Sequence, residues 1–351
     1  MTKPLTDIIV PVWNRPVETR NCLVNLVNHS TDARIIIVDN GSDRETERIL
    51  QEFAEILDQR AILLRNNVNQ GYVRAVNTGI ARSDARYISV ISNTSTVTES
   101  WLETLTGFAE GCRDAGIIVP SLVKTREKKQ GKKTRASTVP MEADHASLAA
   151  MTMTRQAYET IGGIDEGMDG GLWCLMDLSR RAYRAGFLTY RVEESVVYFE
   201  DYVPLGSVER RNTALQRSIE LYRDRWGEPR SYCIHMAKSA DLDMLRQRLD
   251  PLLMGARQGH SFSVITHARL LKELTQAGMD HLHEHIRFIR MPLFFESRAI
   301  DRFLTPAGPI MSEVQPVAGI EGIDFYAGLK GIPFAELEQS IYKTGKEIYG
   351  G

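Results

Sequence analysis

The stretches IIVPVWNRP at residues 8–16 and IIIVDNGSD at residues 35–43 decide the fold of this chain. Each begins with an apolar run rich in β-branched residues, as is typical of a buried strand, and each ends in residues that favour a turn. Helical spacing of apolar residues follows at 16–28 and 45–57, and a further strand-like run lies at 87–91. This alternation predicts an α/β domain with a mostly parallel central sheet and helices on its faces.

The length of the chain, 351 residues, suits two domains. The alternation of strand-like and helix-like segments is interrupted at Trp226-Gly227-Glu228-Pro229, and it resumes with shorter segments beyond that point. We therefore predict an N-terminal domain at residues 1–228 and a smaller C-terminal α/β domain at residues 229–351.

The composition excludes several classes of protein. The chain has 43% hydrophobic and 25% charged residues, and its 43 Lys and Arg against 45 Asp and Glu leave a net charge of -2. Such a balance offers no general attraction for nucleic acid. No run approaches the roughly 18 apolar residues of a transmembrane helix. The four cysteines are far apart, which favours a reducing cytoplasm, with attachment to a membrane surface left open.

Three further segments complete a pattern that begins with the two strands quoted above. They are NVNQGYVRAVNTGI at 67–80, MTRQAYETIGGIDE at 153–166 and MDLSRRAYRAGF at 176–187. In this order and spacing, the five segments resemble the family 2 glycosyltransferases, enzymes of the GT-A fold that transfer a sugar from a nucleotide donor. The resemblance covers roughly residues 5–205 and implies a GT-A (nucleotide-diphospho-sugar transferase-like) N-terminal domain.

A nucleotide site is predicted at the carboxyl ends of the strands, where open α/β sheets bind ligands. Asn14 and Asp39 fall at two such ends. The resemblance implies that Asp39 accepts a hydrogen bond from the base or ribose, although Asp39-Asn40-Gly41 is also a sequence typical of an Asx-type turn. The candidate nucleotide-binding residues are Pro11, Val12, Asn14, Asp39, Asn69, Gly71, Arg74, Ser92, Asn93 and Thr94.

The metal-binding motif of the family is altered in this chain. Family members hold a divalent ion with an Asp-x-Asp type motif after the strand that matches residues 87–91, where this chain has Ser92-Asn93-Thr94. Hydroxyl and amide groups are poor ligands for Mg²⁺ or Mn²⁺, which prefer carboxylates. Phe199 also replaces a histidine that many members carry. We therefore expect no metal ligands here and no required Mg²⁺ or Mn²⁺, and we expect arginines, Arg74 first, to neutralise the diphosphate.

The catalytic base of the family is altered as well. Family members carry an Asp or Glu two to three residues before the aspartate that matches Asp177, and this chain has Cys174 and Leu175 there. Three aspartates are the candidate catalytic residues: Asp165, Asp169 and Asp177. Glu200 and Asp201 are further carboxylates that could act as a base.

Two functions therefore stay open. In one, the chain is an inverting glycosyltransferase that uses a UDP-, GDP- or dTDP-linked sugar and an unknown glycan, lipid or protein acceptor. In the other, it is a catalytically silent GT-A binding or assembly module. The C-terminal domain is a candidate for binding the acceptor, another subunit or a second copy in a homo-oligomer.

Two clusters outside these motifs have ordinary explanations. The basic tract at 124–135 could recruit an acidic acceptor, and a solvated loop is the simpler interpretation. His281, His283 and His285 alternate, so on a strand they would share one face and could bind a metal. A polar approach to a strand is the simpler interpretation there.

Overall fold

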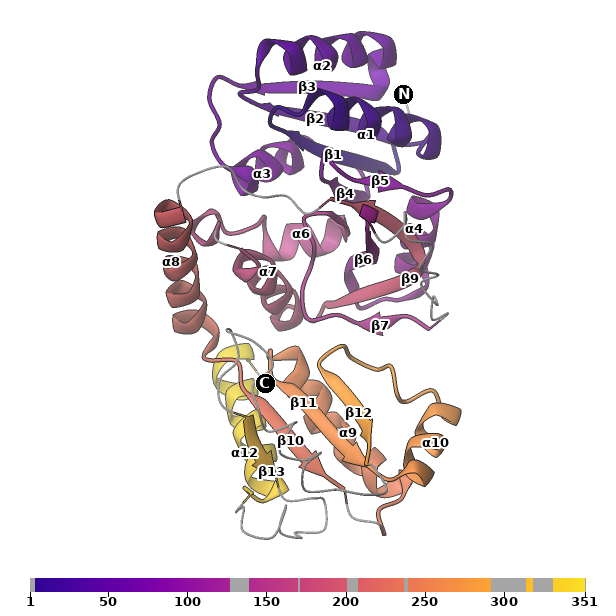
Figure 1. Cartoon of the computed structure of the whole chain (residues 1–351), viewed down its shortest axis with the longest axis vertical. Helices are drawn as coiled ribbons and strands as arrows, with labels where there is room; N and C mark the ends of the chain where they lie inside the picture. Colours follow the sequence, from indigo (N-terminus) through magenta and orange to yellow (C-terminus); the bar gives the residue numbers. More distant parts are fainter. Residues whose placement is uncertain are drawn as a thin grey trace. The chain divides into compact units, whose positions relative to one another are not determined.

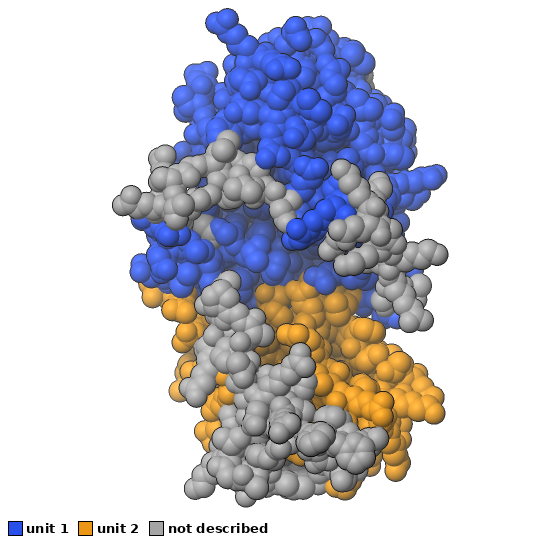
Figure 2. All heavy atoms as spheres, viewed as in Figure 1, with its two compact units in different colours: residues 1–140, 145–222 blue, residues 141–144, 223–351 orange. Residues whose placement is uncertain are grey.

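The computed structural model describes residues 4–126, 139–169, 171–200, 208–236, 239–291, 314–317 and 331–350. The chain divides into two compact units, coloured separately in Figure 2. The first unit holds residues 1–140 and 145–222, and the second holds residues 141–144 and 223–351. This division precedes the predicted boundary at residue 228, because Trp226 stacks on Tyr349 of the second unit with ring centroids 5.2 Å apart.

The first unit alternates strands and helices as the apolar patterns predict (Figure 1). Its strands are β1 (Thr6–Val12), β2 (Arg34–Asn40), β3 (Ala61–Asn66), β4 (Tyr87–Ile91), β5 (Thr96–Val97), β6 (Ala115–Lys124), β8 (Ala150–Thr154) and β9 (Leu188–Phe199). Its helices are α1 (Pro16–His29), α2 (Arg44–Leu57), α3 (Tyr72–Arg82), α4 (Trp101–Gly111), α6 (Arg155–Ile161) and α7 (Trp173–Arg184). Helix α8 (Val208–Trp226) runs from the first unit into the second.

The sheet of the first unit has the strand order β3-β2-β1-β4-β8-β6-β9-β5. Strand β1 pairs in parallel with β2 on one side and with β4 on the other, and every residue of β1 is buried. Only β8 and β5 run antiparallel to their neighbours in this order. The chain order reverses at β1, and in open α/β sheets such a point places a crevice outside the carboxyl ends of the strands.

Helix α3 lies close to the sheet because it presents a glycine to it. A Cβ added at Gly79 would clash with the side chain of Ile9 on β1 and would crowd Val38 on β2. Val73, Val76 and Ile80 of the same helix are fully buried. This close packing sets the start of α3, and therefore residues 69–72, beside the carboxyl ends of β1 and β2.

The second unit has its own sheet, with the order β12-β11-β10-β13 and all described pairs parallel. Its strands are β10 (Ser231–His235), β11 (Ser261–Thr266), β12 (Ile286–Arg290) and β13 (Val314–Val317), and its helices are α9 (Leu242–Arg257), α10 (Ala268–Gln276) and α12 (Phe334–Thr344). Residues 141–144 join this unit, where Glu142 forms a parallel bridge with His283 and a double hydrogen bond with the guanidinium of Arg257. In the parts of the chain that the structure describes, we find no helix with the length and apolarity to cross a bilayer.

Candidate active site

A cavity of about 510 Å³ opens in the first unit at the carboxyl ends of β1, β2 and β4. Eight of the residues proposed from the sequence line it: Pro11, Val12, Asn69, Gly71, Ser92, Asn93, Thr94 and Asp169. The lining also includes Trp13, Arg15, Asn40, Tyr72, Leu148, Ala149, Phe199 and Glu200. Five proposed residues lie outside the lining: Asn14, Asp39, Arg74, Asp165 and Asp177.

The turn after β1 is held in an uncommon backbone conformation. Asn14 and Arg15 both have positive φ, 58° and 59°, although neither is glycine. Such residues cost roughly 1 to 2 kcal/mol each and persist where the surroundings hold them. Here Asn14 donates its N–H to Ser42 Oγ at 3.0 Å, and its Oδ1 accepts the N–H of Asp43 at 2.8 Å. Asn14 therefore acts as a clamp between two loops, and the next residue, Arg15, lines the cavity.

Asp39 is buried beside the cavity and has protein partners for both oxygens. Its Oδ1 accepts the N–H of Ser42 at 2.9 Å, and its Oδ2 lies 3.7 Å from Nη1 of Arg65. The first contact is the local turn interaction that the sequence offered as the alternative role. Consecutive side chains on a strand face opposite sides, so the following residue, Asn40, is the one that lines the cavity.

Asn40 organises the loop that leads to α3. Its Nδ2 donates to Asn69 Oδ1 at 2.9 Å and to the carbonyl of Gly71 at 3.1 Å, while its Oδ1 accepts from Asn66 Nδ2 at 3.0 Å and from the N–H of Gln70 at 3.1 Å. The side chain is buried, with 3% exposure, and these four bonds use its full capacity. The amide of Asn40 therefore fixes the loop from 66 to 71 against the end of β2.

The segment after β4 carries neutral groups. Ser92 Oγ lies 3.1 Å from Thr94 Oγ1, and Asn93 donates its Nδ2 to Thr19 Oγ1 on α1 at 2.9 Å. This donor set does not suit Mg²⁺ or Mn²⁺, which prefer carboxylate oxygens. Among the described residues that line the cavity, the carboxylates are Asp169 and Glu200.

Asp169 lies against the start of α3. A Cβ added at Gly71 would lie 2.8 Å from Asp169 Oδ2, so the glycine leaves room for this carboxylate, and its φ of 97° also favours glycine. Desolvation in the cavity raises the pKa of Asp169, an effect that the N–H of Val73 opposes and the charge of Glu166 reinforces. The residue as a whole is exposed, while its carboxyl group lies against Gly71 in the cavity lining. A carboxylate with a raised pKa is better suited to accept a proton.

The position that the resemblance assigns to the base, Cys174 and Leu175, lies at the buried start of α7. Cys174 is buried, and desolvation raises the pKa of its thiol to about 12, so the thiolate is not formed near neutral pH. Asp177 is fully buried and accepts a hydrogen bond from Nε of Arg181 at 2.8 Å. Arg181 in turn donates to the carbonyls of Ile161 and Gly163. This network gives Asp177 a role in packing the helix.

Arg74 and Asp165 are engaged beside the cavity. Nε of Arg74 donates to Glu166 Oε2 at 2.8 Å, and this bond, followed by one from Asn77, lowers the pKa of Glu166. Asp165 caps a short 3-10 helix by accepting the N–H of Gly167 at 2.8 Å. Of the other proposed carboxylates, Glu200 lines the cavity, and Asp201 lies outside the described residues.

Sequence reasoning missed several lining residues. Arg15 stands within the quoted NRP segment, a position that could have identified it. Tyr72 lies within the stretch from Asn69 to Arg74, which the resemblance places near the ribose and phosphates. Leu148 and Ala149 come from a loop outside all five segments, and nothing in their sequence marks them.

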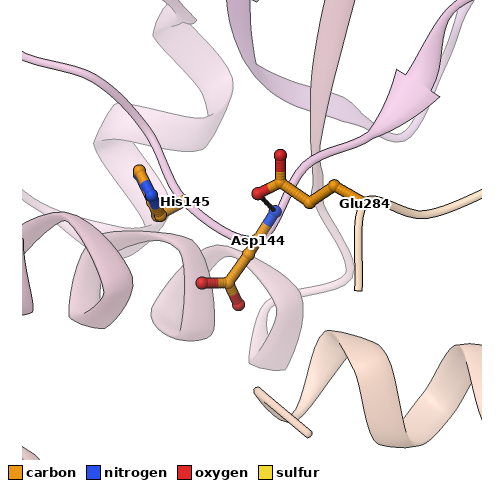
Figure 3. Close-up of side chains that lie close together, drawn as sticks. All are labelled: Asp144, His145 and Glu284. Atoms are coloured by element: carbon orange, nitrogen blue, oxygen red, sulfur yellow. Dashed lines mark hydrogen bonds between the residues drawn. The ribbon is translucent and has the colours of Figure 1, made fainter. Parts of the chain in front are cut away.

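The basic tract and the three histidines at 281, 283 and 285 lie outside the family motifs. Residues 127–135 of the basic tract lie outside the described residues. The histidines precede β12, so they do not share a strand face; His283 is buried and His281 is exposed. Nδ1 of His283 accepts the N–H of His285 at 3.0 Å. Between them, Glu284 accepts the N–H of Asp144 at 2.7 Å, the bond drawn in Figure 3. These contacts support the interpretation as a polar approach to a strand.

The fold and the position of the cavity define the first unit as a GT-A domain. A solved structure with a similar fold is that of GalNAc-T7 with UDP, GalNAc and Mn²⁺, with a TM-score of 0.52 and 15% identity over 64% of this chain and 50% of that one. Residues 7–164 match the sequence model of Glycosyl transferase family 2. The resemblance to family 2 glycosyltransferases is therefore confirmed for this region.

Two curated relatives are similar to part of this chain. Glycosyltransferase AglE of Haloferax volcanii is 31% identical over 106 residues, 29% of this chain and 34% of AglE. Glycosyltransferase GlyA of Streptococcus pneumoniae is 28% identical over 99 residues, 28% of this chain and 14% of GlyA. The chain therefore spans about a third or less of the length of these relatives.

Proposed function

We propose that the chain is an inverting glycosyltransferase that moves a sugar from a UDP, GDP or dTDP donor to a glycan, lipid or protein acceptor. The observation that carries this proposal is the cavity at the carboxyl ends of β1, β2 and β4, which has a carboxylate with a raised pKa, Asp169, in its wall. The family match over residues 7–164 supports the same conclusion. The proposal includes a cytoplasmic location, which rests on cysteine usage.

The proposed chemistry needs one base and one stabilised leaving group. Asp169 accepts the proton of an acceptor hydroxyl, the hydroxyl oxygen forms a bond to the anomeric carbon, and the bond from that carbon to the diphosphate oxygen breaks on the opposite face. This single displacement inverts the anomeric configuration. Glu200 is the second candidate base because it also lines the cavity. Asp165 and Asp177 are weaker candidates, since they lie outside the lining and hold local structure.

The proposed donor site does not depend on a divalent ion. GalNAc-T7 was solved with Mn²⁺, but residues 92–94 of this chain offer hydroxyl and amide groups where the family has carboxylates. No step of the proposed reaction therefore requires a metal. The proposed nucleotide contacts come from Pro11, Val12, Asn69 and Gly71, with Asp39 and Asn14 holding the loops around them.

A silent GT-A binding module is the second candidate function. Cys174 and Leu175, both buried, stand where the family has its base, and residues 92–94 lack carboxylates. A module that keeps the cavity and loses the chemistry would bind nucleotide and not turn over. This alternative shares the donor site with the first and differs from it only in the reaction.

One pair of measurements tests the proposal. Calorimetric titration of UDP, GDP and dTDP, with EDTA and then with Mn²⁺, should show that at least one nucleotide binds equally well in both conditions. Release of the same diphosphate from its sugar donor should then be followed in the unmodified protein and in Asp169→Asn. Binding with turnover that the variant abolishes supports the enzyme, and binding without turnover supports the silent module. Failure of all three nucleotides to bind would sink both.

A further inference from the structure

Arg15 occupies a special place in the cavity. Of the described residues in the lining, it alone is basic, and its side chain is 34% exposed. Its backbone is left-handed, with a φ of 59°, and it precedes Pro16 at the first position of α1. Since such a conformation has a cost for an arginine, the surrounding hydrogen bonds of Asn14 must hold it. The fold thus maintains a strained turn at the residue that brings a positive charge to the cavity.

Hydrogen bonds connect this turn to the segment that replaces the metal motif. Thr19 on α1 is fully buried, and its hydroxyl donates to the carbonyl of Asn14 at 3.2 Å. The same hydroxyl accepts from Nδ2 of Asn93 at 2.9 Å. The N–H of Thr19 also donates to the carbonyl of Arg15 at 2.9 Å. One side chain therefore ties the Arg15 turn to residues 92–94, so the two parts of the lining are held in one arrangement.

Three hydroxyl groups line the cavity near that segment. Ser92 Oγ and Thr94 Oγ1 are 3.1 Å apart, and the Tyr72 hydroxyl donates to the carbonyl of Leu148 at 3.2 Å and also interacts with Ser92. Burial raises the pKa of the Tyr72 hydroxyl, so it keeps its proton near neutral pH. Each hydroxyl has one proton, so the Ser92 and Thr94 pair has one proton left for a phosphate oxygen, and Tyr72 donates to phosphate only by exchanging its bond to Leu148. Charge-assisted bonds to phosphate are stronger than the neutral bonds that they replace.

We propose that Arg15, with the hydroxyls of Tyr72, Ser92 and Thr94, forms a metal-independent diphosphate subsite. This inference rests on the proposed donor site, and it identifies the residues that would bind the diphosphate, the most charged part of the donor. An arginine fork can bind two phosphate oxygens at once, which a lysine cannot match. The subsite should therefore distinguish nucleoside diphosphates from monophosphates without a divalent ion.

This assignment differs from the expectation that Arg74 neutralises the diphosphate. Arg74 lies outside the lining, and Nε of its guanidinium is 2.8 Å from the carboxylate of Glu166. A nearby carboxylate of opposite charge reduces the attraction that Arg74 exerts on an anion. Arg15, in contrast, lines the cavity, so its guanidinium is the better placed of the two to meet a bound diphosphate.

The test compares nucleotides that differ by one phosphate. UDP and UMP, GDP and GMP, and dTDP and dTMP are titrated in EDTA against the full chain and three arginine variants, Arg15→Gln, Arg15→Lys and Arg20→Gln. Arg20 is a matched control, since it is on the same helix and pairs with Glu52 on the surface. We expect Arg15→Gln to weaken the diphosphate that binds by about 10- to 100-fold and its monophosphate by less than about 3-fold.

The other variants sharpen the result. Arg15→Lys should restore part of the loss, Arg20→Gln should change nothing, and the pair Tyr72→Phe and Ser92→Ala should each cost the diphosphate about 3- to 10-fold. The inference is overturned if Arg15→Gln leaves diphosphate binding intact, or weakens both nucleotides equally while its thermal unfolding is unchanged. In either case the proposed donor site stands. If the unmodified protein binds no nucleotide, the proposed function fails together with this inference.

Discussion

The carboxyl ends of β2 and β4 meet at one cavity, yet they are built differently. At the end of β2, Asp39 is a buried carboxylate with two protein partners, and Asn40 makes four hydrogen bonds to the loop before α3. At the end of β4, Ser92 and Thr94 bond to each other, and the segment carries no carboxylate. The side chains at the end of β2 therefore fix the neighbouring loops by hydrogen bonds, whereas the end of β4 presents neutral groups to the cavity.

This difference teaches that the parts of a GT-A site can change separately. The segments around β1 and β2 keep the family pattern, and the structure gives them dense hydrogen bonding that shapes the cavity. The resemblance assigns the metal motif to a short segment after β4, where Ser92 and Thr94 are only partly buried. The motif could therefore be lost while the framework stayed.

The largest expected effect tests whether Asp169, which lies against Gly71 in the cavity wall, carries the chemistry. Asp169→Asn should lower turnover about 10²- to 10⁴-fold, because it removes the proposed base with little change of shape. Since the pKa of Asp169 is raised by desolvation, turnover in the unmodified protein should fall as the pH drops through a range above that of an ordinary aspartate. Initial rates of diphosphate release against pH measure both. Unchanged turnover in the variant would assign the base to another group, with Glu200→Gln as the next variant.

The second prediction sharpens the comparison through stability. Asn40→Ala removes the four hydrogen bonds that the buried amide of Asn40 makes with residues 66–71, so it should lower the free energy of unfolding by about 2 to 3 kcal/mol. Thr94→Ala at the end of β4 removes one hydroxyl contact and should cost less than about 1 kcal/mol. Urea unfolding of the two variants gives the difference. Equal costs would show that the two strand ends are not built differently.

The third prediction attempts to undo the difference. Ser92→Asp with Thr94→Asp restores two carboxylates in the family spacing, so the double variant should acquire a response to Mn²⁺. We expect the metal to strengthen diphosphate binding by about tenfold in the double variant and by less than about twofold in the unmodified protein, a comparison made by calorimetry. Thr94→Asn with Ser92→Asn is the neutral control. A strong Mn²⁺ dependence of the unmodified protein would contradict the metal-independent site.

The smallest effect concerns the Arg74 and Glu166 pair beside the cavity. The pKa of Glu166 is lowered by Arg74, so the pair stabilises the fold above the pH at which glutamate titrates in the unfolded chain, about 4.3, and loses that effect as the pH falls through the lower folded-state value. Because Arg74 and Glu166 are 56% and 39% exposed, solvent screens them, and Glu166→Gln should cost less than about 0.5 kcal/mol at pH 7. Thermal unfolding at pH 7 and pH 3 would reveal it. A larger cost would mark Arg74 as part of the framework.

The sequence predicted the alternation of elements and the parallel sheet because periodicity and β-branched runs are local signals. It also placed residues 92–94 and Asp169 in segments that do line the cavity. The sequence did not show that Asn40, and not Asp39, lines the cavity, because this depends on which face of β2 is turned toward the cavity. Likewise, the Arg74 and Glu166 pair joins residues 92 positions apart, and no local pattern reports such a contact. The grouping of residues 141–144 with the second unit could not be predicted for the same reason, because their partners lie far along the chain, at positions 257 and 282–284.

That four-residue segment has a consequence for biosynthesis. The N–H of Asp144 bonds to Glu284, which is synthesised 140 residues later. At about 5 to 20 residues added per second, the ribosome takes roughly 7 to 30 seconds to deliver that partner. All residues of the first unit have been synthesised by position 222, so it can fold before the partners of residues 141–144 at positions 257 and 282–284 exist. The second unit, which needs residues 141–144 as well as residues 223–351, is consequently the last to be completed.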